Sequence, residues 1–150
     1  MLVPLLSRID HIGIACRDLE TAIERYATFG LQVVSLEVNE EQGVREAMLQ
    51  VGGTEPGTGA GGRPGYVQLL EPLGPDTPVG RFLARRGEGL HHVGYGVDDI
   101  AVALATLGGT GVRLLDERPR HGSMGASIAF LHPADLGGVL TELVQPAGPA

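Results

Sequence analysis

Several classes of protein are excluded by what this sequence lacks. It holds a single cysteine, Cys16, so no internal disulfide can form, and we expect a reducing, cytoplasmic location. It has no apolar run of about 18 residues, so we expect no membrane-spanning helix. The first residues lack the basic leader of a secretory signal, and we expect none. Basic residues do not balance the acidic ones, and the formal charge of −7 argues against nucleic acid or an anionic membrane as a partner.

The chain repeats itself at a fixed spacing. His92 lies 81 residues after His11, and the same step aligns residues 9–34 with residues 90–115 without a gap. A chain of 150 residues, 43% of them hydrophobic, can form one compact domain or two half-domains that share a core. We therefore expect two copies of one supersecondary unit, each with one histidine on its first strand.

The hydrophobic pattern predicts the same order of elements in both copies: a strand, a helix and three further strands. Asp18 suits a helix N-cap, and Thr77 with Pro78 suits the start of a short linker helix. In the first copy the predicted strands cover residues 9–15, 31–38, 44–51 and 66–71. In the second copy a strand from Leu90 precedes a helix that begins at Asp98 or Asp99, strands over 112–116, 127–131 and 139–144, and a loop over 119–125.

The stretch from Gly52 to Gly65 contains seven glycines and two prolines in fourteen residues. This composition cannot form a packed core, so we expect a flexible hairpin loop. A phosphate-binding role is the weaker interpretation, because no Gly-Lys-Ser or Gly-Lys-Thr follows the glycines.

The last strands of the two copies also match, since Gln68–Pro72 aligns with Glu142–Pro146. The step here is 74 residues, and the shortfall from 81 falls where the first copy carries its glycine-rich loop. The sequence therefore predicts a single α+β domain of two tandem βαβββ modules that form a curved sheet around a metal site. The modules cover residues 8–72 and 88–146, and a linker helix lies within residues 73–87.

Four side chains occupy equivalent positions on the first and last strands of the two copies: His11, Gln68, His92 and Glu142. Two imidazoles, an amide oxygen and a carboxylate form a donor set suited to Co²⁺, Mn²⁺, Ni²⁺ or Zn²⁺. A lone histidine on an apolar strand is more often a hydrogen-bonded core residue, but chance rarely places four donors at repeat-related positions. We expect His91 to point away from this site, and His121 and His132 to lie in loops.

Six stretches in order along the chain resemble a known family: Ile9–Ala15, Glu41–Glu46, Gln68–Leu73, Gly87–His92, Phe130–Pro133 and Gly137–Leu143. Together they are similar to the methylmalonyl-CoA epimerases of the vicinal oxygen chelate superfamily. The resemblance implies His11, Gln68, His92 and Glu142 as metal ligands. It also implies Glu46 and Glu142 as the acid/base carboxylates, a CoA thioester as substrate and, together with the need to cover short sheets, a homodimer.

Alternatives remain open within the same fold. A ring-cleaving dioxygenase would use His11, His92 and Glu142 as an Fe(II) triad, but a fourth ligand, Gln68, would occupy a position that oxygen and substrate need. A glyoxalase-type lyase also uses four ligands and a glutamate base, and only the stretch Glu41–Glu46 favours the epimerase. A metal-free binding protein of the bleomycin-resistance type has no use for the four donors.

Overall fold

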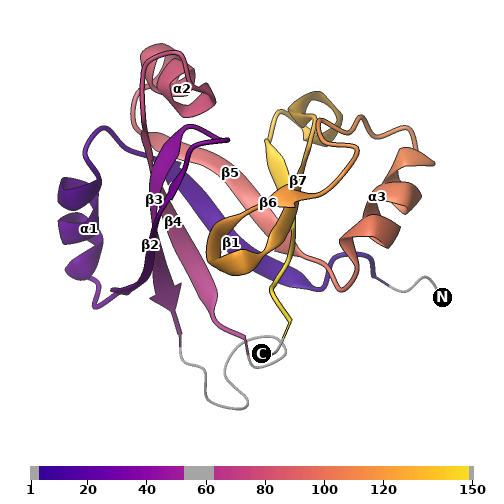
Figure 1. Cartoon of the computed structure of the whole chain (residues 1–150), viewed down its shortest axis with the longest axis horizontal. Coiled ribbons are helices and arrows are strands. Elements are labelled where there is room, and N and C mark those ends of the chain that lie inside the picture. Colours follow the sequence, from indigo (N-terminus) through magenta and orange to yellow (C-terminus); the bar gives the residue numbers. More distant parts are fainter. Residues whose placement is uncertain (1–3, 53–62, 149–150) are drawn as a thin grey trace. The chain divides into compact units, whose positions relative to one another are not determined.

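The structure is a computed structural model that describes residues 4–52 and 63–148 (Figure 1). It divides into two compact units. The first unit comprises residues 11–91, and the second unit comprises residues 1–10 with 92–150. The boundary passes through two strands, β1 (Arg8–Ala15) and β5 (Gly89–Gly96). Most of the stretch predicted as a glycine-rich loop, residues 53–62, lies outside the described residues.

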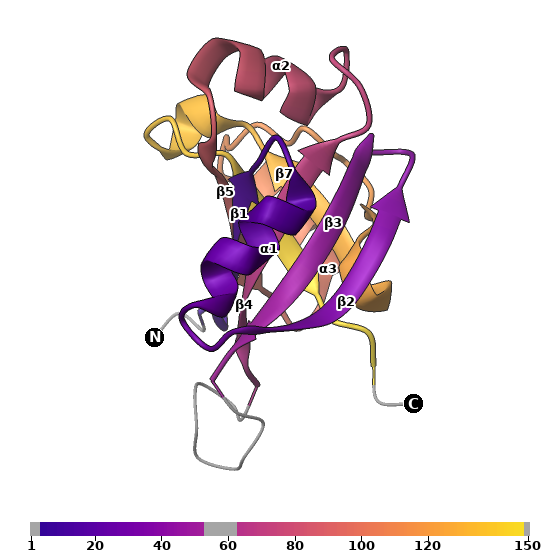
Figure 2. The ribbon, with the colours of Figure 1, turned by 90° about the vertical axis from the view of Figure 1, so that its left-hand side faces the viewer.

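In the first unit the strands pair in the order β2-β3-β4-β1. The β2–β3 and β3–β4 pairs are antiparallel, and β4 runs parallel to β1. Helix α1 packs on one face of these strands, and Figure 2 shows β2 at their edge. The elements that follow β1 are α1 (Leu19–Ala27), β2 (Gln32–Asn39), β3 (Val44–Val51), β4 (Gly65–Pro72) and α2 (Pro78–Arg86).

In the second unit the order is β5-β8-β7-β6, with β8 parallel to β5 and antiparallel to β7. Helix α3 packs against the apolar face of these strands, as α1 does in the first unit. The predicted α+β fold is confirmed. The elements are α3 (Ile100–Gly108), β6 (Arg120–His121), the 3₁₀ turn Ser123–Gly125, β7 (Ser127–Leu131), the 3₁₀ turn Pro133–Leu136 and β8 (Thr141–Gln145).

Both units pair their first and last strands in the same register. Gly13 of β1 lies opposite Gln68 of β4, and Gly94 of β5 lies opposite Glu142 of β8. Each glycine is two residues after the histidine of its strand, so histidine and glycine share one face of the sheet. The sequence match between the last strands therefore corresponds to a real equivalence of position within each unit.

The starts of helices α1 and α3 are each held by two side chains. Asp18 accepts a hydrogen bond from the Thr21 amide at 2.9 Å, and Glu71 of β4 accepts one from the Leu19 amide at 2.7 Å. These bonds satisfy amides that the first turn of a helix leaves without an internal acceptor. In the second unit the same positions are occupied by Asp99, which accepts from Val102 at 3.1 Å, and by Gln145, which accepts from Ile100 at 3.0 Å.

The role of Asp99 as the N-cap of α3 can be tested directly. Asp99→Ala removes the acceptor for the Val102 amide and should lower the free energy of unfolding by about 1 kcal/mol. Asp98→Ala is the matched control, because Asp98 is an exposed neighbour outside the cap. Urea denaturation of both variants checks the prediction, and an equal loss in the two would contradict the assignment of Asp99 as the cap.

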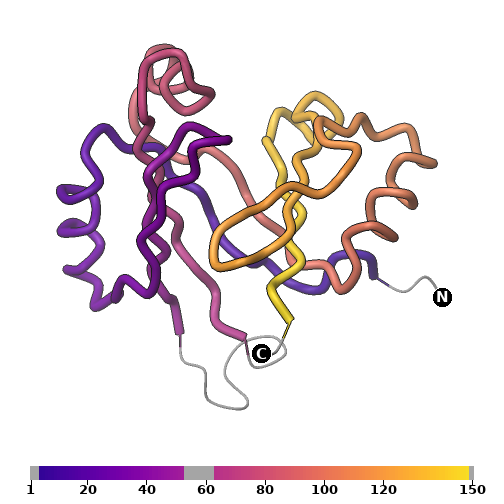
Figure 3. Tube along the Cα trace, viewed as in Figure 1, coloured from indigo at the N-terminus to yellow at the C-terminus, as the bar shows by residue number. Residues whose placement is uncertain are grey.

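The expectation of a strand over residues 112–116 is wrong. Of this segment only Leu114 forms a ladder contact, a single bridge with Leu131, and Figure 3 shows the chain after α3 running as an irregular segment. Side chains take the amides that a ladder would use: Asp116 accepts from Phe130 at 2.9 Å, and Asp135 accepts from Arg113 at 3.0 Å.

The second strand of this unit is instead β6, which pairs with β7 and falls where a loop was expected. His121 therefore lies in a two-residue strand and not in a loop. No helix in the described part of the chain is long and apolar enough to cross a membrane.

Cys16 belongs to the core of the first unit. It is buried, its Sγ lies 3.4 Å from the Leu70 carbonyl oxygen, and it packs among the residues beneath α1. Burial, followed by the nearby carboxylate of Glu71, raises the pKa of its thiol to about 12. The thiol thus stays protonated at neutral pH and serves as a small core residue.

Candidate functional site

The first unit places three sequence-predicted residues on one sheet face. His11 of β1, Gln68 of β4 and Glu46 of β3 lie on the face opposite α1, and each is 3–6% exposed. The residues between them along each strand point to the helix side, because side chains alternate between the faces of a strand. Gly13, opposite Gln68, adds no side chain to this face. We call these three residues the first half-site.

Glu46 and Gln68 are joined by a hydrogen bond. Gln68 Nε2 donates to Glu46 Oε2 at 3.0 Å. A carboxylate can only accept, so the amide NH₂ must face Glu46 and the amide oxygen must point elsewhere. The bond therefore orients both groups: Glu46 is held as an acceptor, and the Gln68 carbonyl oxygen faces away from Glu46.

Helix α2 closes one end of the first half-site. Its residues Val79 and Leu83 pack with Val44, Leu70 and Ala15, all on the same sheet face. Val44 is two residues from Glu46 on β3, and Leu70 is two residues from Gln68 on β4. The linker helix thus forms an apolar end wall, which keeps water from one side of the two polar groups.

The second unit places His92 and Glu142 together on the sheet face opposite α3. His92 Nε2 lies 3.8 Å from Glu142 Oε2, and both residues are 3–4% exposed. The Phe130 ring contacts the His92 ring edge to face, with centroids 5.5 Å apart, and Phe130 lies opposite Glu142 in the β7–β8 ladder. Because metal–nitrogen and metal–oxygen bonds are about 2.0–2.2 Å long, one ion could bind both atoms. We call His92 and Glu142 the second half-site.

The donors fit a divalent metal ion. An imidazole and an amide oxygen in the first half-site, with an imidazole and a carboxylate in the second, are the nitrogen and oxygen donors that Zn²⁺ and its neighbours prefer. A buried carboxylate is costly unless a cation or hydrogen bonds compensate it. Glu46 and Glu142 are both buried, so each half-site holds negative charge that a cation would balance.

The two half-sites differ at one further position. In the first unit Glu46 lies opposite Leu70, two residues after the donor Gln68. In the second unit Ile128 lies opposite Val144, two residues after the donor Glu142. Isoleucine therefore stands in the second unit where the first unit has the carboxylate of Glu46. The position of Ile128 can be found from the sequence by aligning the two strands that precede the donors Gln68 and Glu142.

The other histidines lie outside the half-sites. His91 packs its ring edge to face on Phe82 of α2 with centroids 4.9 Å apart, and burial lowers its pKa to about 4. His91 therefore packs on α2 and does not join His92 on the face of the half-site, as predicted. His132 Nδ1 accepts a hydrogen bond from the Ala134 amide at 3.1 Å and so caps a 3₁₀ turn.

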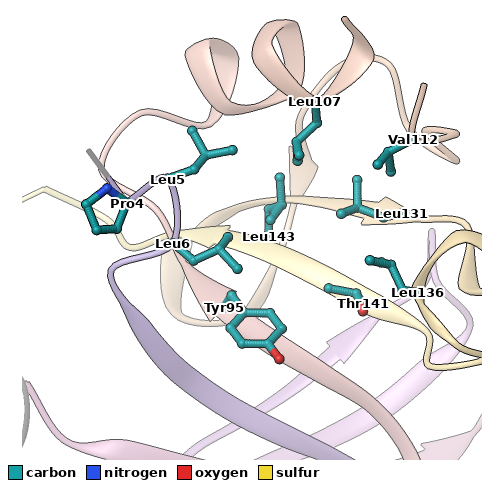
Figure 4. A pocket seen from close by; sticks show the side chains of 10 residues that line it. All are labelled: Pro4, Leu5, Leu6, Tyr95, Leu107, Val112, Leu131, Leu136, Thr141 and Leu143. Atoms are coloured by element: carbon teal, nitrogen blue, oxygen red, sulfur yellow. The ribbon is translucent and has the colours of Figure 1, made fainter. Parts of the chain in front are cut away.

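An apolar cavity of about 540 Å³ lies in the second unit, on the helix side of the strands (Figure 4). Leucines such as Leu107, Leu131 and Leu143 line it, and hydroxyls come only from Tyr95 and Thr141 among the ten lining residues. It holds no group that could exchange a proton at neutral pH or bind a metal ion, so it is not the candidate active site.

Comparison with known families agrees with the fold. The model of the glyoxalase/bleomycin resistance protein/dioxygenase superfamily matches residues 10–130. The match spans the first unit and extends into the second, and the chain therefore belongs to this superfamily.

Individual relatives narrow the family. The mitochondrial methylmalonyl-CoA epimerase of Bos taurus is 37% identical over 93% of this chain and 75% of its own length. The ethylmalonyl-CoA/methylmalonyl-CoA epimerase of Cereibacter sphaeroides is 33% identical over 94% and 99%. A variant of the Streptomyces coelicolor methylmalonyl-CoA epimerase, solved in complex with 2-nitronate-propionyl-CoA, is 51% identical, with a TM-score of 0.89 and coverage of 95% and 99%. Within the superfamily the chain belongs with the methylmalonyl-CoA epimerases.

Proposed function

We propose that this protein is an isomerase that interconverts (2R)- and (2S)-methylmalonyl-CoA. The observation that carries the proposal is the buried, hydrogen-bonded carboxylate of Glu46 beside Gln68, in a chain 51% identical over 95% of its length to a methylmalonyl-CoA epimerase. The reaction removes the hydrogen between a thioester carbonyl and a carboxylate and returns it from the other side. A carboxylate held as an acceptor suits the first step.

Two carboxylates supply the proton transfers in this proposal. Glu46 is not needed as a ligand, so it takes the α-proton from one face of the substrate. Glu142 serves the opposite face, and it is also a metal ligand, which lowers its basicity. Inversion requires two groups because a single base that takes and returns the proton on one face leaves the configuration unchanged.

We further propose that His11, Gln68, His92 and Glu142 hold one divalent ion, with Co²⁺ as the first candidate and Mn²⁺, Ni²⁺ and Zn²⁺ as alternatives. Each half-site supplies only two of these donors, and such ions take at least four ligands, so both half-sites are required. When bound, the ion supplies a positive charge that stabilises the enolate and screens the substrate carboxylate.

Deuterium uptake tests the proposed reaction. The protein, loaded separately with each of the four metal ions, is incubated with methylmalonyl-CoA in D₂O, and α-carbon deuterium is followed by NMR. We expect uptake together with inversion of configuration. Uptake without inversion would contradict the epimerase, and no uptake with turnover of a methylglyoxal hemithioacetal would establish a glyoxalase-type lyase instead.

We also propose a cytoplasmic homodimer. Edge strand β2 exposes Val34, Leu36 and Val38 by 47–62%, so the first unit has apolar surface that a second copy could cover. Light scattering at micromolar concentration should give about twice the chain mass of 15.7 kDa. A mass of a single chain under these conditions would refute the dimer.

A further inference from the structure

The face that carries His92 and Glu142 is mainly apolar, with Arg120 of β6 opposite Ile128 as a further polar residue. Ala126, Ile128 and Val144 form a buried cluster on it, and Phe130 packs against this cluster. Ala126, Ile128 and Val144 are each 3–7% exposed, and their side chains carry no polar group. The first half-site differs, because Glu46 stands there at the position that Ile128 occupies in the second unit.

The position of Ile128 beside Glu142 indicates what Ile128 contacts. Ile128 lies opposite Val144, and Glu142 lies opposite Phe130, so Ile128 and Glu142 are diagonal neighbours on one face of the β7–β8 pair. In the proposed function Glu142 reaches the α-carbon of the substrate, since it exchanges a proton with that atom. The side chain at position 128 lies beside that carbon, but it can neither exchange a proton nor accept a hydrogen bond.

Only one substituent of the α-carbon suits such a neighbour. The carbon carries a thioester carbonyl, a carboxylate, a hydrogen and an alkyl group. The first two need polar partners and the hydrogen must face a base, so the alkyl group remains for an isoleucine. Burial of a methyl group against an aliphatic side chain is favourable because it removes apolar surface from water.

Ile128 cannot withdraw to admit a larger group. A Cβ atom built on Gly122 would lie 2.6 Å from Ile128 Cγ2, so the Gly122 backbone stands directly against the side chain. The Gly122 amide donates to the Ala126 carbonyl oxygen at 2.9 Å, which holds this backbone in place. Isoleucine is also branched at Cβ and restricted in χ1. A rigid side chain with backbone directly against it sets a sharp limit on volume.

We propose that Ile128 determines the size of the α-alkyl group of the acyl-CoA substrate and favours methyl over ethyl. This inference rests on the proposed epimerase function. One methylene group in an apolar pocket changes kcat/KM by about 10- to 200-fold. Wild-type protein should therefore process ethylmalonyl-CoA at least about tenfold less efficiently than methylmalonyl-CoA.

The test compares kcat/KM for α-deuterium exchange of methylmalonyl-CoA and ethylmalonyl-CoA. Ile128→Ala should raise the ethyl-to-methyl ratio by about tenfold or more, and Ile128→Val should raise it by a smaller factor. Ile100→Ala and Ile100→Val are the matched controls, because Ile100 is equally buried at 3% exposed but packs in the α3 cluster on the other face of the strands. Both controls should leave the ratio within about twofold, although they lower stability by amounts similar to those of the Ile128 variants.

The outcomes separate this inference from the function on which it rests. Wild-type exchange of methylmalonyl-CoA with an unchanged ratio in both Ile128 variants overturns the role of Ile128 alone. Equal wild-type efficiency with the two substrates overturns it as well. Absence of exchange with either substrate in metal-loaded wild-type protein overturns the proposed function, and the inference with it. Ile128→Val removes only one methylene group and so costs less stability than Ile128→Ala. It therefore keeps the test decisive if Ile128→Ala fails to fold.

Discussion

Glu46→Gln is expected to slow epimerisation of methylmalonyl-CoA by roughly 10²–10⁴-fold while folding and metal content stay unchanged. The substitution keeps the shape of the side chain and removes only its capacity to take a proton. Its amide oxygen can still accept the hydrogen bond that Gln68 Nε2 now donates to Glu46 Oε2 at 3.0 Å. The first half-site should therefore remain assembled, so the loss measures proton transfer and not unfolding.

Glu37→Gln is the matched control for this variant. Glu37 is half-buried and lies directly opposite Glu46 in the β2–β3 ladder, but it is one strand further from the donor Gln68. It should turn over at close to the wild-type rate. Glu142→Gln should weaken metal binding as well as turnover, because Glu142 is proposed as both a ligand and a base.

The two-base mechanism also predicts an asymmetric exchange. If each carboxylate serves one hand of the substrate, Glu46→Gln should still exchange the α-hydrogen of one epimer with D₂O, without inverting it, and should leave the other epimer untouched. NMR of the separate epimers in D₂O gives this directly. Equal loss of exchange on both epimers, with the metal retained, or a wild-type rate, would show that the two-carboxylate mechanism is wrong.

The parts of the site that follow from the internal repeat could be predicted from the sequence. His11 and His92 share a strand position because residues 9–34 and 90–115 align without a gap. Gln68 and Glu142 share a position on the last strand of each copy. The strand registers Gly13–Gln68 and Gly94–Glu142 agree with that match. A repeat of this length constrains position strongly because one supersecondary unit must bury the same face each time it occurs.

The contacts that depend on pairing between distant strands could not be predicted. The bond between Gln68 and Glu46 requires a particular register of β3 against β4, and the long glycine-rich connection between them does not fix that register. The equivalence of Glu46 with Ile128 was hidden for the same reason. The failed strand over residues 112–116 has another cause: the apolar pattern there is real, but Asp116 and Asp135 capture amides that the ladder would need.

Removal of the metal ion is expected to abolish activity and to lower the thermal midpoint. Glu46 and Glu142 are buried at 3–4% exposed, and without a cation their negative charge has less compensation in the folded state. An ion present at 100 times its dissociation constant stabilises the folded state by about 2.7 kcal/mol, which corresponds to roughly 5–10 °C in a chain of this size. Dialysis against a chelator followed by scanning calorimetry measures the shift, and Co²⁺ should restore it.

The single substitution His92→Ala should also abolish activity and lower the thermal midpoint. It removes the imidazole whose Nε2 lies 3.8 Å from Glu142 Oε2, and with it the edge-to-face contact on Phe130. Metal content by elemental analysis should fall well below one ion per chain, and added metal should no longer raise the thermal midpoint. His121→Ala is the control, since that exposed histidine of β6 lies outside both half-sites and its loss should leave metal content at the wild-type value. Full activity of wild-type protein with less than about 0.1 divalent ion per chain would remove the metal from the mechanism altogether, because a stoichiometric ligand set cannot be filled at that occupancy.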